Sequence, residues 1–347
     1  MLVVDIPVVA KLVETLSLKT FYALLVQYMR EDFLAWDTFN QCPRISFKHE
    51  KGIMELMPIF NQDYFANKYV CTHKDNHYRQ RYVVMGQGLW VDAHTGTPLM
   101  ISEMTILTAL RTAAVSLMVS QAVLKHPVSV MTIIGCGAQS HFQLLAHSQA
   151  FDFKEIRCFD VDVQAMQQFV ADMKKEGVEV KPCASAQEAV LDSDFIITLT
   201  NANRVYPVLR AEWLKPGVHI NAMGGDSPGH SELDVAILHQ ASLILIEYFD
   251  QTQLEGEIQQ LNLTEHSHKI MALNDFLKLP YSREQGAEFT IFDGVGIALL
   301  DYSTLRLVWD LCQKHNLGHD LDMLPPYDQS KNLYKFLTSN IKETIPS

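Results

Sequence analysis

From residue 128 onward, short apolar runs rich in β-branched residues alternate with segments whose apolar positions recur at helical spacing. This alternation predicts βαβ units and therefore a parallel sheet. The helical segments are QSHFQLLAHSQ, VQAMQQFVADMKK and SAQEAVL, and in the last of these Ser185 and Glu188 have the spacing of a capping box. The expected strands are VSVMTIIG (128–135), EIRCFD (155–160), VEVKPC (178–183), DFIITLT (194–200), GVHINAMG (217–224) and SLILIEYF (242–249), with FTIFD (289–293) closing the set.

Before residue 128 the pattern is different. A helix is expected over residues 18–36, and it is followed by strand-like pieces that turn-forming Gly, Pro and Asn separate. A second helix within residues 102–126 leads into the parallel domain. This order is typical of an antiparallel α+β domain. The strand-like pieces are RISFKHEKGIMELMP, NKYVCTH and RYVVMGQGLWVDAHTGTP.

The two patterns together predict a two-domain α/β protein. The parallel domain is expected over residues 127–303, because Pro127 ends the preceding helix. The first domain is expected over residues 1–126 and 304–347, because residues 294–315 (GVGIALLDYSTLRLVWDLCQKH) have the pattern of a long amphipathic helix that returns the chain to it.

Composition narrows the possible functions. The chain has 347 residues, 48% of them hydrophobic, which is enough to form a large core. Its net charge of −12 argues against a protein that neutralises the phosphates of a nucleic acid or lies on an anionic membrane. The longest apolar runs fall far short of the roughly 20 residues that cross a bilayer, so no membrane or export segment is expected. A function on small molecules is the remaining expectation.

The six cysteines are scattered along the chain without a C-x-x-C pair. This distribution is typical of reduced thiols, so we expect no disulfide and a cytoplasmic location. Cys71, His73 and His77 are close enough in sequence to suggest a metal site, but no second cluster supplies a matching ligand, so no metal is expected. His266 and His268 have the pattern of a solvated loop.

The run TIIGCGAQSHFQ (132–143) follows an expected strand and opens an expected helix. In a dinucleotide-binding turn, glycines such as Gly135 and Gly137 allow a tight turn and close approach of a pyrophosphate. The third glycine of that fingerprint is missing, and a glycine turn also occurs for packing reasons alone. Asp160, at the end of the next strand, would bind ribose hydroxyls and repel a 2′-phosphate, which favours NAD over NADP. Its alternative role is that of a helix N-cap.

Four charged residues stand in surroundings that suggest a ligand. Arg111 lies in the apolar helical segment TALRTAAVSLM, where a guanidinium needs a carboxylate or phosphate ligand, or else an internal ion pair with Asp or Glu. Arg44 and Lys68 stand in strand-like segments whose alternation can aim both at one face, although basic residues are usually solvated. Glu55 interrupts the apolar run IMELMPIF, and a buried carboxylate there needs a partner such as a cationic amine.

Asp226 follows two glycines in NAMGGDSPGHSELD (221–234). It stands just beyond the expected strand 217–224, at the edge where open parallel sheets bind their ligands. The glycines would let a ligand pack against the backbone. An Asp beside a cationic amine is expected to accept its proton if desolvation raises the pKa of this Asp toward the working range. The alternative is an ordinary surface turn.

From about Asp5 to the 320s, the chain resembles the ornithine cyclodeaminase/mu-crystallin family. The dinucleotide turn is shared by many enzymes, whereas ELMP, ALRTAA, GGD-x-PG and EGEIQQL in this order are specific. The matching stretches are RISFKHEKGIMELMP, NKYV, SEMTILTALRTAAVSLM, IIGCGAQS, NAMGGDSPGHSELD, EGEIQQL and FDGVGIALLDY.

The resemblance implies a homodimer in which a Rossmann-type NAD-binding domain is joined to a substrate-binding and dimerisation domain. It implies that Asp226 is the catalytic acid/base, that the substrate carboxylate is held by Arg44, Lys68 and Arg111, and that Glu55 meets the distal amine. The further contacts it implies are Val295 for the substrate and, for NAD, Val83, Arg111, Gly135, Gly137, Ala138, Gln139, Asp160, Thr200, Met223, Gly224, Gly225, Asp226, His230 and Gly294.

The chain departs from the family pattern at three of these positions. His230 stands where bacterial cyclodeaminases have lysine after Pro-Gly, Val83 replaces a threonine near the nicotinamide, and Gly294 stands where a serine contact is expected. The departures concern details of NAD binding rather than the cofactor class, because the backbone donors and Asp160 remain.

The activity that the resemblance implies is the conversion of L-ornithine to L-proline and ammonia. NAD takes a hydride from Cα while Asp226 accepts the α-amino proton, the δ-amine attacks the resulting imine, ammonia leaves, and the hydride returns to the cyclic imine. Other members of the family reduce cyclic ketimines, act as alanine dehydrogenases or, as crystallins, bind the nucleotide without turnover. Glu55 within ELMP favours the diamine substrate.

Overall fold

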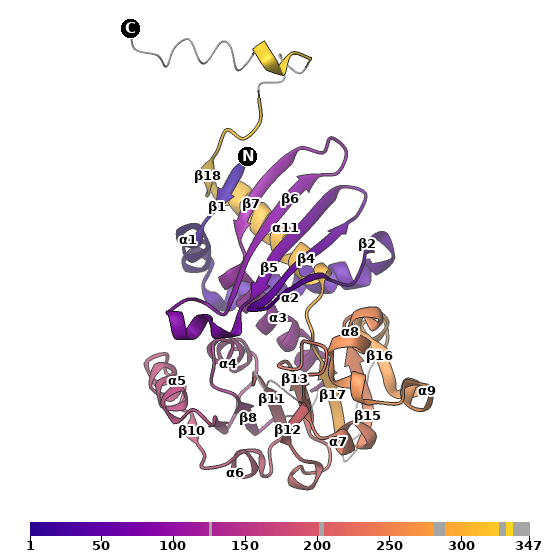
Figure 1. The fold of residues 1–347 in the computed structure, drawn as a ribbon. Coiled ribbons are helices and arrows are strands. Elements are labelled where there is room, and N and C mark those ends of the chain that lie inside the picture. Colours follow the sequence, from indigo (N-terminus) through magenta and orange to yellow (C-terminus); the bar gives the residue numbers. More distant parts are fainter. Residues whose placement is uncertain (125–126, 201–204, 281–288, 326–330, 336–347) are drawn as a thin grey trace.

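The protein, described here from a computed structural model, has two domains that lie one above the other (Figure 1). The structure describes residues 1–124, 127–200, 205–280, 289–325 and 331–335. The N-terminal part of the chain and a C-terminal helix form the first domain, and the middle of the chain forms the second. The expected α/β class, with a parallel sheet in the second domain, is confirmed.

The first domain is built on a mostly antiparallel sheet. Within the described residues, its strand order is β18-β1-β7-β6-β5-β4-β2, and β3 also pairs with β4. Side chains along a strand point alternately to the two faces of a sheet, so that Ala66, Lys68 and Val70 of β5 all point to the buried face. The strands are β1 (Leu2–Val4), β2 (Asn40–Gln41), β3 (Ile45–His49), β4 (Gly52–Phe60), β5 (Tyr64–Thr72), β6 (Val84–Asp92), β7 (Pro98–Glu103) and β18 (His319–Asp320).

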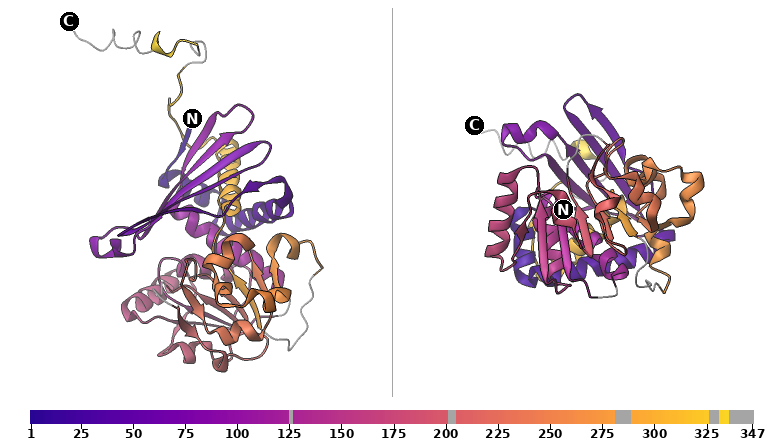
Figure 2. Two further views of the ribbon diagram at one scale, coloured as in Figure 1. Left: turned by 45° about the vertical axis from the view of Figure 1, so that its right-hand side comes forward. Right: turned by 90° about the horizontal axis from the view of Figure 1, so that it is seen from below.

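Helices cover one face of this sheet, and α11 contacts strands β4, β5 and β6 as well as helices α2 and α3 (Figures 1 and 2). The core between them includes Phe21, Trp90 and Tyr302, and the rings of Trp90 and Tyr302 lie 4.8 Å apart. Burying each large apolar side chain contributes about 1.5–3 kcal/mol, so this layer holds the domain together. The helices are α1 (Ile6–Leu16), α2 (Leu18–Leu34), η1 (Trp36–Thr38), η2 (Lys74–Arg79), α3 (Thr105–Val123) and α11 (Ala298–His315).

The N-terminus differs from the sequence expectation. The helix expected over residues 18–36 is α2, but a strand and a further helix, β1 and α1, precede it. Asp5 and Pro7 form the start of α1: the Asp5 carboxylate accepts a hydrogen bond from Val8 N at 3.0 Å, and proline is tolerated in the first turn.

The second domain contains the parallel sheet. Among the residues described, its strand order is β10-β9-β8-β11-β13-β17-β15-β16, and every pair in it is parallel. The strand that was expected to close the set, β17, lies inside the sheet between β13 and β15, and the edge is β16, which was not predicted. The strands are β8 (Val130–Ile134), β9 (Glu155–Phe159), β10 (Lys181–Pro182), β11 (Phe195–Thr198), β13 (His219–Ala222), β15 (Ala241–Ile246), β16 (Ile270–Ala272) and β17 (Phe289–Asp293); a separate pair is β12 (Val205–Leu209) with β14 (Ser231–Leu233).

The helices of the second domain follow the predicted spacing. At α6, Ser185 Oγ accepts from Glu188 N at 3.1 Å, and the Glu188 carboxylate accepts from Ala184 N at 2.9 Å, so the predicted capping box is present with its return bond one residue earlier. The helices are α4 (Ser140–Ser148), α5 (Val163–Lys175), α6 (Ala186–Val190), η3 (Ala211–Trp213), α7 (Val235–Gln240), α8 (Phe249–Glu255), η4 (Glu257–Gln260), α9 (Leu263–His266), η5 (Ser267–Lys269) and α10 (Leu273–Phe276).

Two segments connect the domains. Helix α3 leads into β8, and the chain returns from β17 into α11, which begins at Ala298 rather than at the expected boundary of residue 304. The boundary moves because Ala298 to Tyr302 are already buried in the first domain's helical layer. Helix α3 is long and apolar enough to cross a bilayer by length and composition, but 67% of its apolar stretch is buried inside the protein, as in a core helix.

Candidate active site

The predicted site residues of the second domain lie at the carboxyl ends of adjacent parallel strands. The turn with Gly135 and Gly137 follows β8, Asp160 follows β9, and Thr200 follows β11. The loop carrying Asp226 follows β13, and Gly294 follows β17. This edge of an open parallel sheet is where ligands bind, because loops and backbone donors converge there.

The glycine-rich turn has the conformation that a dinucleotide site requires. Gly135 has a φ of +103°, and a Cβ there would lie 2.8 Å from the carbonyl carbon of Leu199, so a side chain is excluded. Gly137 and Ala138 are exposed just before α4, with open space beside Gly137. Nearby, Gln139 Oε1 is buried without a hydrogen-bond partner among the described residues. Exposed backbone donors at a helix N-terminus suit a pyrophosphate.

Asp160 is fixed beside this turn. Its carboxylate accepts hydrogen bonds from Cys136 N at 2.6 Å and from Asp162 N at 2.8 Å. The alternative role of Asp160 as a helix N-cap is wrong, because Asp162 caps α5 by accepting from Gln164 N. A carboxylate held at the end of β9, next to the turn, fits the ribose hydroxyls of a dinucleotide.

Arg44, which immediately precedes β3, reaches into the interface between the domains. Its guanidinium donates to the Glu55 carboxylate at 3.3 Å and to the carbonyl oxygens of Val295 at 2.5 Å and Gly296 at 2.8 Å. Its Nε lies 3.2 Å from Glu255. Burial alone would lower the pKa of Arg44, but the carboxylates of Glu255 and Glu55 outweigh it and raise this pKa. Arg44 therefore stays charged: its two terminal nitrogens donate hydrogen bonds to protein acceptors, whereas its Nε is paired with Glu255 by charge alone.

Lys68 and Arg111 share one carboxylate, that of Asp301 on α11. Lys68 Nζ lies 2.8 Å from it and Arg111 Nε lies 3.4 Å from it. The internal ion pair, which was one of the two alternatives for Arg111, is thus present. In the described residues, the terminal nitrogens of Arg111 make no hydrogen bond, and they lie against Gly296, where a Cβ would be 2.7 Å away. Burial lowers the pKa of Lys68 to about 8, although Asp301 acts in the opposite direction.

Asp226 is exposed on the loop after β13 and accepts a hydrogen bond from Ser227 Oγ at 3.4 Å. Its negative charge acts on Arg44, on Lys74 from the first domain, and on His230. Burial and the charge of Lys74 lower the pKa of His230, and Asp226 opposes them. Asp226 therefore faces the basic residues of both domains.

Two of the family departures have a structural account. Gly294 lies against Met223, where a Cβ would be 2.6 Å from the sulfur, so a side chain at this position would require the end of the Met223 side chain to move. Val83 lies in the first domain between η2 and β6, where its carbonyl accepts from His73 N at 2.8 Å. Among the described residues, no backbone hydrogen bond joins Val83 to the glycine-rich turn.

Sequence reasoning missed a set of buried acids around the site. Glu247 accepts from the backbone N–H groups of Val295 at 3.1 Å and Gly296 at 2.6 Å, which shapes the loop that Arg44 contacts. Glu247 and Asp301 interrupt apolar runs, which is the signal that singled out Glu55, so the same test could have found them. The buried acids that were missed are Glu232, Glu247, Glu255, Glu257, Asp293 and Asp301.

These acids give the protein a specific pH dependence. Burial raises the pKa of Glu232, Glu247, Glu255 and Asp293 to about 7, from 4.5 for the three glutamates and 3.8 for the aspartate. Between the ordinary pKa values and about 7, these four acids bind more protons in the folded state than in the unfolded state. Their contribution to the free energy of unfolding is therefore complete below the ordinary pKa values and is lost as the pH rises to about 7.

We therefore expect the free energy of unfolding to decrease between pH 5 and pH 7.5, measured by urea denaturation at constant ionic strength. Glu247→Gln should make this decrease shallower, whereas the exposed substitution Glu212→Gln should leave it unchanged. An increase in stability over the same interval would contradict the protonation of these acids.

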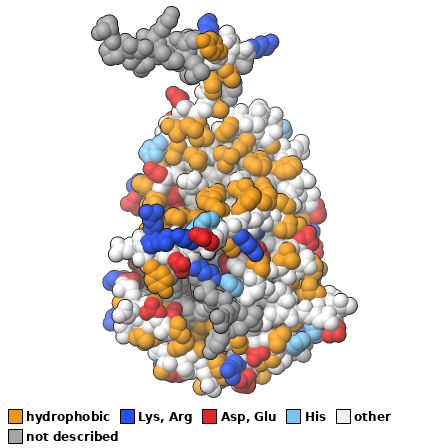
Figure 3. Space-filling view, viewed as in Figure 1, with side chains coloured by type: hydrophobic (Ala, Val, Ile, Leu, Met, Phe, Trp, Pro, Cys, Tyr) orange, Lys and Arg blue, Asp and Glu red, His pale blue; other side chains and the backbone are white. Residues whose placement is uncertain are grey.

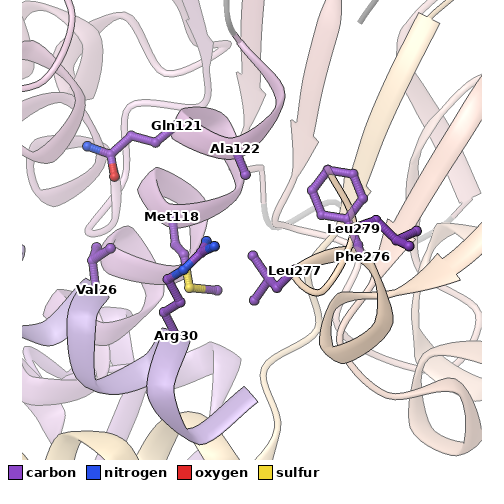
Figure 4. A pocket seen from close by; sticks show the side chains of 8 residues that line it. All are labelled: Val26, Arg30, Met118, Gln121, Ala122, Phe276, Leu277 and Leu279. Atoms are coloured by element: carbon purple, nitrogen blue, oxygen red, sulfur yellow. The ribbon is translucent and has the colours of Figure 1, made fainter. Parts of the chain in front are cut away.

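The structure also has a pocket of about 180 Å³ elsewhere, between α2, α3 and α10 (Figure 4). Arg30 and Gln121 are its polar residues, and none of the predicted site residues lines it. This cavity is therefore separate from the predicted site residues. Among the described residues, no group of three or more His, Cys, Asp or Glu side chains could hold a metal ion.

Comparison with known proteins shows the family of the chain. The model of the ornithine cyclodeaminase/mu-crystallin family matches residues 7–316. The ornithine cyclodeaminase of Agrobacterium fabrum is 36% identical over 324 residues, which cover 92% of this chain and 90% of that protein.

Two solved structures share the whole fold. An archaeal alanine dehydrogenase dimer with bound NAD is 29% identical with a TM-score of 0.83, and the match covers 93% of this chain and 99% of that one. The Δ1-pyrroline-2-carboxylate reductase of Thermococcus litoralis, in complex with NADH and L-proline, is 26% identical with a TM-score of 0.84, covering 92% and 100%. The sequence match and the fold agree, and the chain belongs to the ornithine cyclodeaminase/mu-crystallin family.

Proposed function

We propose that the protein is an ornithine cyclodeaminase, which converts L-ornithine to L-proline and ammonia with NAD as a recycled cofactor. The observation that carries this proposal is the cluster at the domain interface, where three cations, Arg44, Lys68 and Arg111, lie among the carboxylates Glu55, Glu255 and Asp301. A site with both charges suits a substrate that has one carboxylate and two ammonium groups. The similarity to the Agrobacterium fabrum enzyme supports the same reaction.

The cofactor is NAD. The open backbone at Gly137 and Ala138 would hold the pyrophosphate, and the Asp160 carboxylate would bind the ribose. Relatives of the same fold carry NAD or NADH in their solved structures. When bound, NAD supplies a hydride acceptor that later returns the hydride to the same substrate.

The substrate carboxylate would lie against Lys68 and the terminal nitrogens of Arg111, near the backbone of Val295. Arg44 would contribute mainly by its charge, because a direct contact requires it to release one of its protein acceptors. Glu55 and Glu255, both held by Arg44, would receive the distal ammonium. Fixing both ends of a flexible diamine favours the intramolecular attack that closes the ring.

Asp226 would move the protons. Exposed on its loop and facing the cationic cluster, it can accept the α-ammonium proton before hydride transfer and return a proton to the departing ammonia. In this role, Asp226 takes up one proton and gives one back, so it ends the catalytic cycle in the protonation state in which it began.

Glu255→Gln tests the assignment of the distal ammonium. At pH 8, where Glu255 is mostly ionised because its pKa is about 7, loss of its charge should raise KM for L-ornithine about tenfold, the effect of losing roughly 1.4 kcal/mol of binding. The inhibition constant of L-proline, which has no second amine, should change much less. Glu212→Gln is the matched surface control. An equal change for both ligands would mean that Glu255 acts only through Arg44.

The decisive experiment incubates the purified protein with L-ornithine and a catalytic amount of NAD and measures proline and ammonia. Equal amounts of both products, without net NADH, are expected. Net NADH formed from L-alanine would instead indicate an alanine dehydrogenase, and NADH oxidation by a cyclic ketimine would indicate a ketimine reductase. Binding of NADH without any turnover would indicate a crystallin-like binding protein.

We also propose that the protein is a homodimer formed through the outer face of the first sheet. Hydrophobic side chains gather over this domain in Figure 3. Ile45, Phe47, Tyr69 and Met85 on β3, β5 and β6 are exposed although the opposite face of the sheet is already covered by helices. A sheet that is apolar on both faces needs a second layer. Light scattering at micromolar concentration should give twice the mass of one chain.

A further inference from the structure

Glu232 is a buried residue of β14 that connects two strand ends of the second domain. One carboxylate oxygen accepts a hydrogen bond from Thr200 N at 2.5 Å and another from the Thr200 hydroxyl. The other oxygen accepts from Gly224 N at 3.1 Å. Thr200 follows β11 and Gly224 follows β13, so one side chain joins the ends of two neighbouring strands.

The contact is too close to tolerate another side chain. A Cβ at Gly224 would lie 2.2 Å from the Glu232 carboxylate and 2.4 Å from the carbonyl oxygen of Thr200. Glycine at position 224 therefore lets the backbone approach Glu232. The first glycine of the GGD sequence is explained by this acid, independently of any ligand.

A second buried acid holds Glu232 itself. The Glu257 carboxylate accepts from Glu232 N at 2.6 Å and from Leu233 N at 3.1 Å. A Cβ at Gly225 would lie 2.7 Å from the same carboxylate. Asp293, at the end of β17, then accepts from Ile258 N at 3.0 Å. The loop that leads to Asp226 is thus supported by three buried carboxylates, those of Glu232, Glu257 and Asp293. Each of them accepts a hydrogen bond from a backbone N–H group of a neighbouring segment.

We infer that Glu232 is a positioning residue for the reaction: by binding Thr200 and Gly224 together, it fixes the distance between the cofactor side of the site and the loop that carries Asp226. This inference rests on the proposed function, in which Thr200 contacts NAD and Asp226 moves the protons. Glu232 touches neither ligand in this assignment. It acts through the two backbone segments that do.

Glu232→Gln tests the inference with little change of size. The amide keeps one acceptor oxygen but turns an NH₂ group toward either Thr200 or Gly224, so one buried donor loses its partner. We expect kcat for L-ornithine to fall by roughly 10- to 100-fold, as a displaced catalytic group does, with KM within threefold. KM is preserved because Glu232 makes no contact with Lys68, Arg111 or Glu55.

A purely structural role is distinguished by the isotope effect. Active sites are counted by NADH fluorescence titration, and kcat is compared for L-ornithine with hydrogen or deuterium at Cα. Misplacement of the Asp226 loop slows the chemical steps and should increase the isotope effect on kcat. Loss of folded protein would lower the number of NADH sites and leave both the kcat per site and the isotope effect unchanged.

Two variants complete the experiment. Glu212→Gln, an exposed glutamate, should match the wild type. Thr200→Val removes only the hydroxyl donor and should shift kcat per site and the isotope effect in the same direction by a smaller amount, which provides the test if Glu232→Gln does not fold. A Glu232→Gln protein with wild-type kcat per site and isotope effect would overturn the inference.

Failure of the proposed function has a different signature. A wild-type protein that forms no proline but turns over another substrate contradicts the cyclodeaminase assignment, and the same variants are then compared on that reaction. A wild-type protein that binds NADH without any turnover contradicts both the proposed function and the role of Glu232.

Discussion

Replacing Asp226 with Asn should lower kcat for L-ornithine by about 10²–10⁴-fold, the usual contribution of a positioned acid/base group, while the dissociation constant for NADH stays within about twofold. Asn keeps the size of the side chain and can still accept a hydrogen bond from Ser227, but it cannot take up a proton. Steady-state kinetics combined with NADH fluorescence titration measure the two quantities on the same preparation.

Asp152→Asn is the matched control for this change, since Asp152 is also an exposed aspartate of the second domain. Its kcat and NADH affinity should equal those of the wild type. If Asp226→Asn lost turnover and NADH binding to the same extent, Asp226 would be a residue that shapes the cofactor site rather than the proton carrier.

Replacing Asp301 with Asn should destabilise the protein by about 3–5 kcal/mol, the cost of removing one partner from a buried ion pair. Asp301 and Lys68 have side chains that are only 1% exposed, and Arg111 shares the same carboxylate. The substitution leaves two buried cations without their anion. Since folded proteins are stable by only about 5–15 kcal/mol, urea denaturation should show a large decrease in the midpoint.

Asp310 provides the comparison on the same helix. It is exposed and accepts a hydrogen bond from the Tyr28 hydroxyl at 2.9 Å, so Asp310→Asn should cost less than about 1 kcal/mol. Similar losses for the two variants would mean that the charge of Asp301 is unimportant. Destabilisation of Asp301→Asn should also be smaller at pH 9.5 than at pH 7, because Lys68, with a pKa of about 8, is then mostly neutral.

The second domain was largely predictable because its signals are local. Each apolar run becomes a strand, Gly135 in the turn after β8 has the positive φ that the motif requires, and Gly137 has open space beside it. The position of β17 was not predictable in the same way. Residues 289–293 are the last of the expected strands along the chain, but strand order depends on how the crossover connections pack, and periodicity carries no information about that.

The candidate site could be predicted only in part, for a similar reason. Glu55 was found because a charge that interrupts an apolar run is a local signal, whereas Glu232 stands in a turn-rich segment where an acid is unremarkable. Its burial depends on Thr200 and Gly224, which are distant in sequence and meet only in the folded sheet. For Arg111, the sequence allowed two alternatives, a bound ligand or an internal ion pair, and the structure shows why both were reasonable. Its Nε makes the ion pair with Asp301, while its terminal nitrogens face the loop after β17.

The return of the chain through α11 has a consequence for biosynthesis. The sheet of the first domain is synthesised early, but the helix that contacts β4, β5 and β6 begins only at Ala298, after the entire second domain. In a nascent chain, the surface of β4, β5 and β6 that α11 covers therefore stays exposed while the second domain emerges from the ribosome and folds. Chaperone dependence and aggregation of truncated chains should consequently be governed by the interval between the synthesis of β7 and that of α11.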